Sequence, residues 1–252
     1  MSAVAGIAVH EADVRPHPLL VSIFLHLAPG AAVLGAYLGL LPGVRAAGLP
    51  SNVALLVAFL AIGAPLLVGL LARAGRDRDG RFPAVRYREG LAWPRSAWLV
   101  AGLSLWLVAV SSVLGPLEQT LQLKGMFAWI PADLRLDDLV TAGPTGLAVV
   151  TALSLVANVV VPATEELYFR GYLLPRLPLG GRAAVLVNTL LFSLYHFWLP
   201  WQFASRVMGL LPMVASVRRS RSVAVGIAVH VIVNSTGTLA LLAMLLANSA
   251  RQ

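Results

Sequence analysis

Long apolar stretches separated by short polar segments dominate the pattern of this chain. A helix that crosses a bilayer needs about 20 apolar residues. Seven stretches approach or exceed that length: 19–41, 52–72, 97–117, 145–174, 183–199, 200–217 and 222–247. Arg206 and Pro212 interrupt the sixth stretch, and the last is long enough for one tilted span or for a helix broken near Gly237. The pattern therefore predicts an all-α fold, a polytopic integral membrane helical bundle with seven to eight transmembrane helices.

The composition agrees with this fold class and removes several kinds of function. Only 12% of the residues are charged, against about 25% in a typical soluble domain. The mean hydropathy is +0.81. Cysteine is absent, which excludes disulfide frameworks, cysteine-ligated zinc and thiol nucleophiles.

The net charge of +8 comes mainly from arginines in the loops between apolar stretches. Residues 73–96 hold seven arginines and three acidic residues. The positive-inside rule predicts that this loop and the N-terminus are cytoplasmic. If the source is a prokaryote, the membrane is the bacterial cytoplasmic membrane. We expect the partner of these charges to be the lipid bilayer and not a nucleic acid.

Two adjacent carboxylates, Glu165 and Glu166, end the fourth apolar stretch and are the only acidic residues after Asp138. Ionisable residues at membrane depth are costly, so the pair is a candidate functional site. Glu166 and Arg170 are four residues apart and share a helix face, whereas Glu165 points about 100° away. This spacing predicts that Arg170 holds Glu166 and leaves Glu165 for proton chemistry. The alternative is an ion pair that only joins helices.

Two later stretches carry polar residues at a similar expected depth. His196 follows Phe192 by four residues, and Asn234 follows His230 by four, so each pair shares a helix face. Counted from the nearest arginine-containing loop, Glu165 and His230 should lie roughly 13–17 Å deep, and His196 about 21 Å deep. We therefore expect three separate spans to bring these groups into one layer of the bilayer. Hydrogen bonding between helices is the alternative interpretation of His230 and Asn234.

This set of side chains suits the hydrolysis of a peptide bond, which needs an activated water and a stabilised oxyanion. A buried carboxylate can act as the base, or a divalent metal held by histidine and carboxylate can activate the water. Cation or proton transport also uses intramembrane acids, but it does not require the histidines and the asparagine. A serine triad is not expected, because no acid follows Ser193 and no G-x-S-x-G sequence surrounds it.

Three motifs in order make the chain resemble a known family. They read Glu165-Glu166-Leu-Tyr-Phe-Arg170, Phe192-Ser-Leu-Tyr-His196 and His230-Val-Ile-Val-Asn234. In order and spacing they are similar to the motifs of the CPBP family of intramembrane proteases, also called the CAAX protease and bacteriocin-processing (Abi) family. The resemblance covers about residues 145–240. It implies a protease-like catalytic core at 145–247, preceded by three transmembrane helices and their loops at 1–144.

The resemblance also implies site residues and an activity, that of an α-helical intramembrane endopeptidase. Glu165 would activate the water with the help of His196. The catalytic residues implied are Glu165, Glu166, His196, His230 and Asn234, with Arg170 and Phe192 in support. His230 and Asn234 would serve as oxyanion donors or metal ligands. If a metal is used, we expect zinc held by Glu165, His196 and His230.

The expected partner is a membrane-associated peptide or protein, of a prenylated CAAX type or resembling a bacteriocin. The active site is expected to open toward the cytoplasmic side. The alternative within the same family is a non-proteolytic scaffold or immunity protein. The motif positions favour the enzyme, because all of them are intact.

Overall fold

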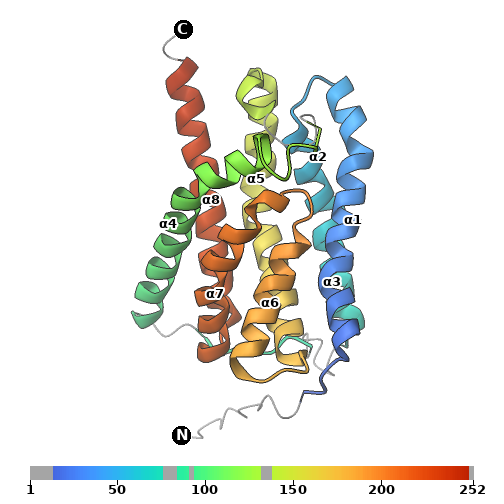
Figure 1. The fold of residues 1–252 in the computed structure, drawn as a ribbon, viewed down its shortest axis with the longest axis vertical. Helices are drawn as coiled ribbons and strands as arrows, with labels where there is room; N and C mark the ends of the chain where they lie inside the picture. Colours follow the sequence, from blue (N-terminus) through green and yellow to red (C-terminus); the bar gives the residue numbers. More distant parts are fainter. Residues whose placement is uncertain (1–13, 76–83, 91–93, 132–137, 250–252) are drawn as a thin grey trace, which may run out of the picture.

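The computed structural model describes residues 14–75, 84–90, 94–131 and 138–249 (Figure 1). These residues form an all-helical bundle without a β-strand; an isolated bridge joins Arg88 and Ser222. The α-helices are α1 (Leu19–Ala46), α2 (Ser51–Ala58), α3 (Ala64–Arg73), α4 (Arg95–Leu123), α5 (Pro144–Glu165), α6 (Gly181–Tyr195), α7 (Phe203–Ser220) and α8 (Val223–Ser249). Two π-helical segments are η2 (Phe59–Gly63) and η5 (Glu166–Leu173), and the 3₁₀ segments are η4 (Asp138–Thr141), η6 (Leu174–Arg176) and η7 (Pro200–Gln202).

Four helical segments are long and apolar enough to cross a membrane. They are Leu19–Ala46, Ser51–Arg73, Ser96–Leu123 and Pro144–Arg176. Two shorter apolar helices, Gly181–Tyr195 and Val223–Leu239, accompany them. The all-α membrane fold agrees with the hydropathy pattern, whereas the number of seven to eight spans stays a prediction. Helix α8 runs without a break through Gly237, so the expectation of one long helix is the correct one of the two.

Helices α6 and α7 form a hairpin whose turn lies well inside the length of the bundle (Figure 1). The fifth apolar stretch was expected to be helical to residue 199, but α6 ends at Tyr195 and α7 begins at Phe203. His196 leaves the helical conformation, with ψ at 58°. Leu199 precedes a proline, which disfavours the α region, and it too lies outside that region, with φ at −136° and ψ at 58°. Residues 196–202 are therefore non-α connecting chain at the depth of the candidate site.

The helix that carries the two carboxylates changes its winding where they lie. Pro162 has no N–H to donate, and three residues later α5 gives way to the π-helical segment η5, which begins at Glu166. The winding of the helix therefore changes within about one turn of Pro162. Backbone carbonyls at membrane depth need partners. The Asn188 amide on α6 supplies one, because its Nδ2 donates to the Phe169 carbonyl at 3.0 Å.

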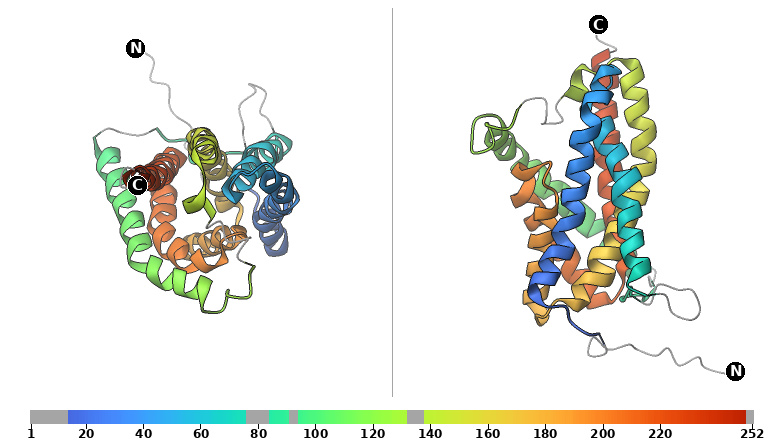
Figure 2. Two further views of the ribbon diagram at one scale, coloured as in Figure 1. Left: turned by 90° about the horizontal axis from the view of Figure 1, so that it is seen from above. Right: turned by 90° about the vertical axis from the view of Figure 1, so that its right-hand side faces the viewer.

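The arginine-rich segments gather at one end of the bundle. The C-terminal ends of α3 and α7 and the N-terminal ends of α1, α4, α6 and α8 all lie there (Figures 1 and 2).

Helix α1 packs closely against the end of α6, next to the candidate site. A Cβ on Gly30 would overlap the backbone carbonyl of Tyr195, the residue that precedes His196. Only glycine therefore lets α1 approach the end of α6 this closely.

Candidate functional site

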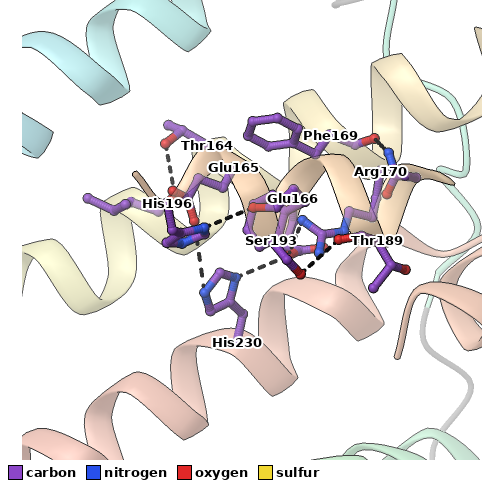
Figure 3. Close-up of polar contacts among 12 residues, drawn as sticks. Thr164, Glu165, Glu166, Phe169, Arg170, Thr189, Ser193, His196 and His230 are labelled. Atoms are coloured by element: carbon purple, nitrogen blue, oxygen red, sulfur yellow. Dashed lines mark hydrogen bonds and ion pairs between the residues drawn. The ribbon is translucent and has the colours of Figure 1, made fainter. Parts of the chain in front are cut away.

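Glu166 and Arg170 form the buried charged pair predicted from their spacing. Both side chains are 0% exposed, and Arg170 Nη1 lies 3.2 Å from Glu166 Oε1. The guanidinium carbon lies 3.8 Å from the centre of the Phe192 ring, which adds a cation–π contact. Phe192 thus supports the arginine from α6 while Glu166 neutralises it. Figure 3 shows the Glu166 side chain between Arg170 and His230.

His230 joins this pair to the second carboxylate. Its Nδ1 lies 3.0 Å from Glu166 Oε1, so an Nδ1–H donates to that oxygen. This bond directs Nε2 toward Glu165, whose Oε2 is 3.9 Å away. Which nitrogen of a neutral histidine carries the proton is set by the bond that the other ring nitrogen makes. Glu166 therefore orients His230, and the imidazole presents its other nitrogen to Glu165.

Glu165 is buried yet sparsely bonded. Its side chain is 2% exposed, and Oε1 has no hydrogen-bond partner among the described residues. The Tyr195 hydroxyl interacts electrostatically with this carboxylate and likewise has no hydrogen-bond partner in the described part of the chain. Buried polar atoms are normally hydrogen-bonded, so an exception of this kind needs an explanation. The two carboxylates thus differ as predicted, with Glu166 held by Arg170 and His230 and Glu165 left facing the cavity.

His196 enters the site from the connecting segment that follows α6. Its Nδ1 lies 2.9 Å from the Phe192 carbonyl oxygen, one helical turn earlier. Its ring packs edge-on against Phe192 with centroids 4.9 Å apart, and His230 packs against the same ring at 6.2 Å. The Phe192 ring therefore separates and orients the two histidines, and the bond at Nδ1 leaves the Nε2 of His196 for other partners.

A cavity of about 670 Å³ brings most of the predicted site residues together. Its lining includes Glu165, Phe192, His196, His230 and Asn234, which come from α5, α6, the connecting segment and α8. Glu166 and Arg170 do not line it and lie behind the Glu165 side chain as its support. Groups predicted to share one layer of the bilayer therefore do share one cavity.

The cavity extends from Glu165 toward one end of the bundle. Along α5 the lining passes from Glu165 back to Asn158, and along α8 it passes forward from His230 to Asn234. Both directions lead away from the arginine-rich end of the bundle. The cavity continues along α4 as far as Gln122. If the arginine-rich end is cytoplasmic, the site does not open directly toward the cytoplasm. The reason is that η5 and its buried ion pair fill the space on that side.

Sequence reasoning missed several residues of this cavity. Its polar end is formed by Glu118, Gln119 and Gln122 on α4 and by Gln202, the last residue of η7. Arg206 also lines it, although the sequence suggested only that this arginine interrupts a span. A signal was present, because Arg206 is a charged residue within an apolar stretch and Glu118 directly follows one. Nothing in the sequence indicated that α4 lies against α7.

The described residues do not assemble a metal site. No group of three or more histidine, aspartate or glutamate side chains among them is arranged to hold a metal ion. Glu165 Oε2 and His230 Nε2 are ligand types that suit zinc, and the bond from Glu166 to Nδ1 is of the kind that supports a ligating histidine. His196 does not complete a set of three with them in this arrangement. Zinc therefore stays a prediction.

Gly226 on α8 makes room for the Glu166 carboxylate. A Cβ on this glycine would lie 2.5 Å from Glu166 Oε2, and the carboxylate cannot move freely because Arg170 and His230 hold its other oxygen, Oε1. Overpacking of this kind costs about 1–3 kcal/mol. We expect Gly226→Ala to lower both thermal stability and any activity that depends on His230. The thermal midpoint of the purified protein in detergent measures the first effect.

Gly237→Ala is the matched control, because it lies on the same helix with no atom within 4 Å of its added Cβ. Alanine favours a helix over glycine by about 1 kcal/mol, so this variant should be neutral or slightly stabilised. Equal behaviour of the two variants would show that Glu166 is not held by close packing against α8.

A comparison with protein-family models finds a match to part of the chain. Residues 147–236 match the model described as type II CAAX prenyl endopeptidase Rce1-like. The match contains all three motifs and stays within the segment 145–247 expected to form the catalytic core. No curated protein and no solved structure matches the chain.

Proposed function

Since residues 147–236 belong to the Rce1-like family of type II CAAX prenyl endopeptidases, we propose that this membrane protein is an endopeptidase with Glu165 as its general base. The observation that carries the proposal is the difference between the two carboxylates. Oε1 of Glu166 is bound by Arg170 and His230 and this residue does not line the cavity, whereas Glu165 does line it. A base must reach the bound water to take its proton, and of the two carboxylates only Glu165 is placed to do so.

The proposed first step is the attack of water on the scissile carbonyl. Glu165 accepts a proton from the water as the new C–O bond forms, and His196 helps to hold that water through its free Nε2. The acid form of Glu165 then returns the proton to the leaving amine as the C–N bond breaks. A low-dielectric cavity strengthens each of these interactions, because little bulk water competes with them.

The negative charge that develops on the carbonyl oxygen needs donors. Asn234 can donate from its side-chain amide, and it lines the cavity one helical turn beyond His230. His230 can donate to the same oxygen from Nε2 when both ring nitrogens carry a proton, while Nδ1 stays bonded to Glu166. A single donor of this kind typically contributes about 10²–10³-fold to the rate.

The proposed substrate is a peptide held at the membrane, of a prenylated CAAX type or anchored in another way. The cavity volume lies within the usual range for ligand sites, about 300–1,000 Å³. Leu55, Phe59 and Leu107 line it with apolar surface, so a chain that is itself embedded in lipid can enter without losing apolar contacts.

The test is a cleavage screen with lipid-anchored peptides in proteoliposomes, read by mass spectrometry. Wild type should release fragments, and Glu165→Ala should not. If Glu165→Ala restores a cellular phenotype as well as wild type does, the chain acts as a scaffold or immunity protein and the proposed enzyme is wrong.

Zinc dependence is a separate prediction. If zinc bound by Glu165, His196 and His230 takes part, then chelation should remove activity and stoichiometric zinc should restore it. Elemental analysis of the purified protein checks occupancy. Full activity in protein that contains no metal would leave the glutamate-and-histidine mechanism as the working one.

A further inference from the structure

Arg206 is a charged group in the candidate cavity that the proposed water chemistry does not use. It lies on α7, is partly buried, and lines the same cavity as Glu165 and His230. An ionisable side chain at this depth is costly and usually serves a function. The question is what its charge is for.

Two hydrogen bonds hold the guanidinium, and both acceptors are neutral. Nη1 donates to the Leu199 carbonyl at 3.0 Å, and Nη2 donates to Gln202 Oε1 at 2.8 Å. Arginine has five N–H donors in a planar fork, so three remain. Nη1 and Nη2 have these partners and Nε is not a buried atom without one, so the Nε donor faces accessible space. The connecting segment thus fixes the arginine without neutralising it.

No carboxylate in the described part of the chain forms an ion pair with Arg206. Glu118 and Glu165 attract it only from farther away. Glu118 is already engaged, because its Oε1 accepts the Ser205 backbone N–H at 3.3 Å near the start of α7. Buried charges are normally paired, so this cation is arranged to receive an anion from outside the chain.

We propose that Arg206 binds a carboxylate of the peptide substrate and so sets which bond reaches Glu165. This inference rests on the proposed function. The anion comes from the free carboxyl terminus of the peptide or from an acidic side chain, and both offer the two oxygens that suit a guanidinium fork. Gln119 and Gln122 line the same polar end and are placed to bind the adjoining peptide groups. Arg206 would then be a specificity residue that acts through substrate position.

Binding to the Glu165→Gln protein in nanodiscs tests this without cleavage. Three palmitoylated decapeptides are compared: one with a free carboxyl terminus, one with an amidated terminus, and one amidated with glutamate as the last residue. We expect amidation to weaken binding by about 10-fold or more, the size of a charge-assisted hydrogen bond. If glutamate restores the binding, the site reads any carboxylate; if it does not, the site reads the terminus.

The same comparison in Arg206→Gln should show no preference for the acid over the amide. Arg206→Lys should keep part of it, because lysine keeps the charge and loses the fork. Arg182→Gln is the matched control, since this arginine is exposed at the start of α6 and should leave the preference intact. Equal binding of acid and amide by the Arg206-containing protein would overturn the inference, as would a preference that survives Arg206→Gln.

Kinetics separate this inference from the proposed function. In the Glu165-containing enzyme, Arg206→Gln should raise KM for the free-acid peptide by about 10-fold, with a smaller change in kcat. Cleavage that persists in Glu165→Gln would overturn the proposed base and leave the carboxylate preference standing. If Glu165→Gln abolishes cleavage as expected but Arg206→Gln leaves KM for the free-acid peptide unchanged, only the inference about Arg206 is overturned.

Discussion

Replacing Glu165 by glutamine should lower the rate of peptide cleavage by at least about 10²–10⁴-fold, the usual contribution of a positioned general base. Glutamine has nearly the same shape and fills the same place in the cavity, but it cannot take a proton from water. The folded state should not suffer, because removing an incompletely paired buried charge removes a desolvation cost. Cleavage in proteoliposomes and the thermal midpoint in detergent measure the two effects independently.

Glu89→Gln is the control for the charge change. Glu89 is exposed at the arginine-rich end, far along the chain from the cavity-lining residues, and we expect full activity. If Glu165→Gln cleaves within a few-fold of wild type while Glu89→Gln is also active, Glu165 is not the base. A loss of activity that comes with a large fall in the thermal midpoint would assign Glu165 to folding.

Replacing Arg170 by methionine should destabilise the protein by about 3–5 kcal/mol, the cost of breaking a buried ion pair by removing one partner. Glu166 would keep its charge at 0% exposure, with only His230 within ion-pair distance. The variant would also lose the cation–π contact with Phe192. The denaturation midpoint in mixed micelles, followed by tryptophan fluorescence, provides the measurement. Cleavage should fall too, because Glu166 orients His230.

A second substitution distinguishes a charge effect from a packing effect. In Glu166→Gln/Arg170→Met both charges are gone, so the double variant should be more stable than Arg170→Met alone. It should still be impaired in cleavage, since glutamine holds His230 less firmly than a carboxylate does. Arg182→Met, an exposed arginine changed in the same way, should melt like wild type. If Arg170→Met melts like this control, the pair does not stabilise the bundle.

Much of the fold could be predicted from hydropathy. A helix must satisfy its own backbone in lipid, so apolar length alone indicates where a spanning helix lies. The bounds of the first four apolar stretches agree to within a few residues with the helical segments from α1 through α5. The stretch at 183–199 was not, because Pro200 and the conformation of His196 end the helix early. Average hydropathy does not detect such an end, since the residues that follow are still apolar.

The site was predicted in part for an equally physical reason. Spacing by four places side chains on one helix face, and this was sufficient to pair Glu166 with Arg170. Depth counted from the arginine-rich loops was sufficient to predict that Glu165 and His230 lie close together, as they do. The bond between His230 Nδ1 and Glu166 was not predictable, because it depends on how α8 is rotated against η5. The division into segments 1–144 and 145–247 stays a prediction, although α2 and α4 line the cavity from the first segment.

The sequence alone determined two features of this protein: its apolar stretches and the pair of adjacent acids, Glu165 and Glu166, late in the chain. They follow from short-range rules: the length of a span, the cost of a charge in lipid, and the periodicity of a helix. The tertiary structure decided which acid faces the cavity, where that cavity leads, and that Arg206 shares it. These depend on the rotation and contact of helices far apart in the chain, where close packing and not local pattern selects the arrangement.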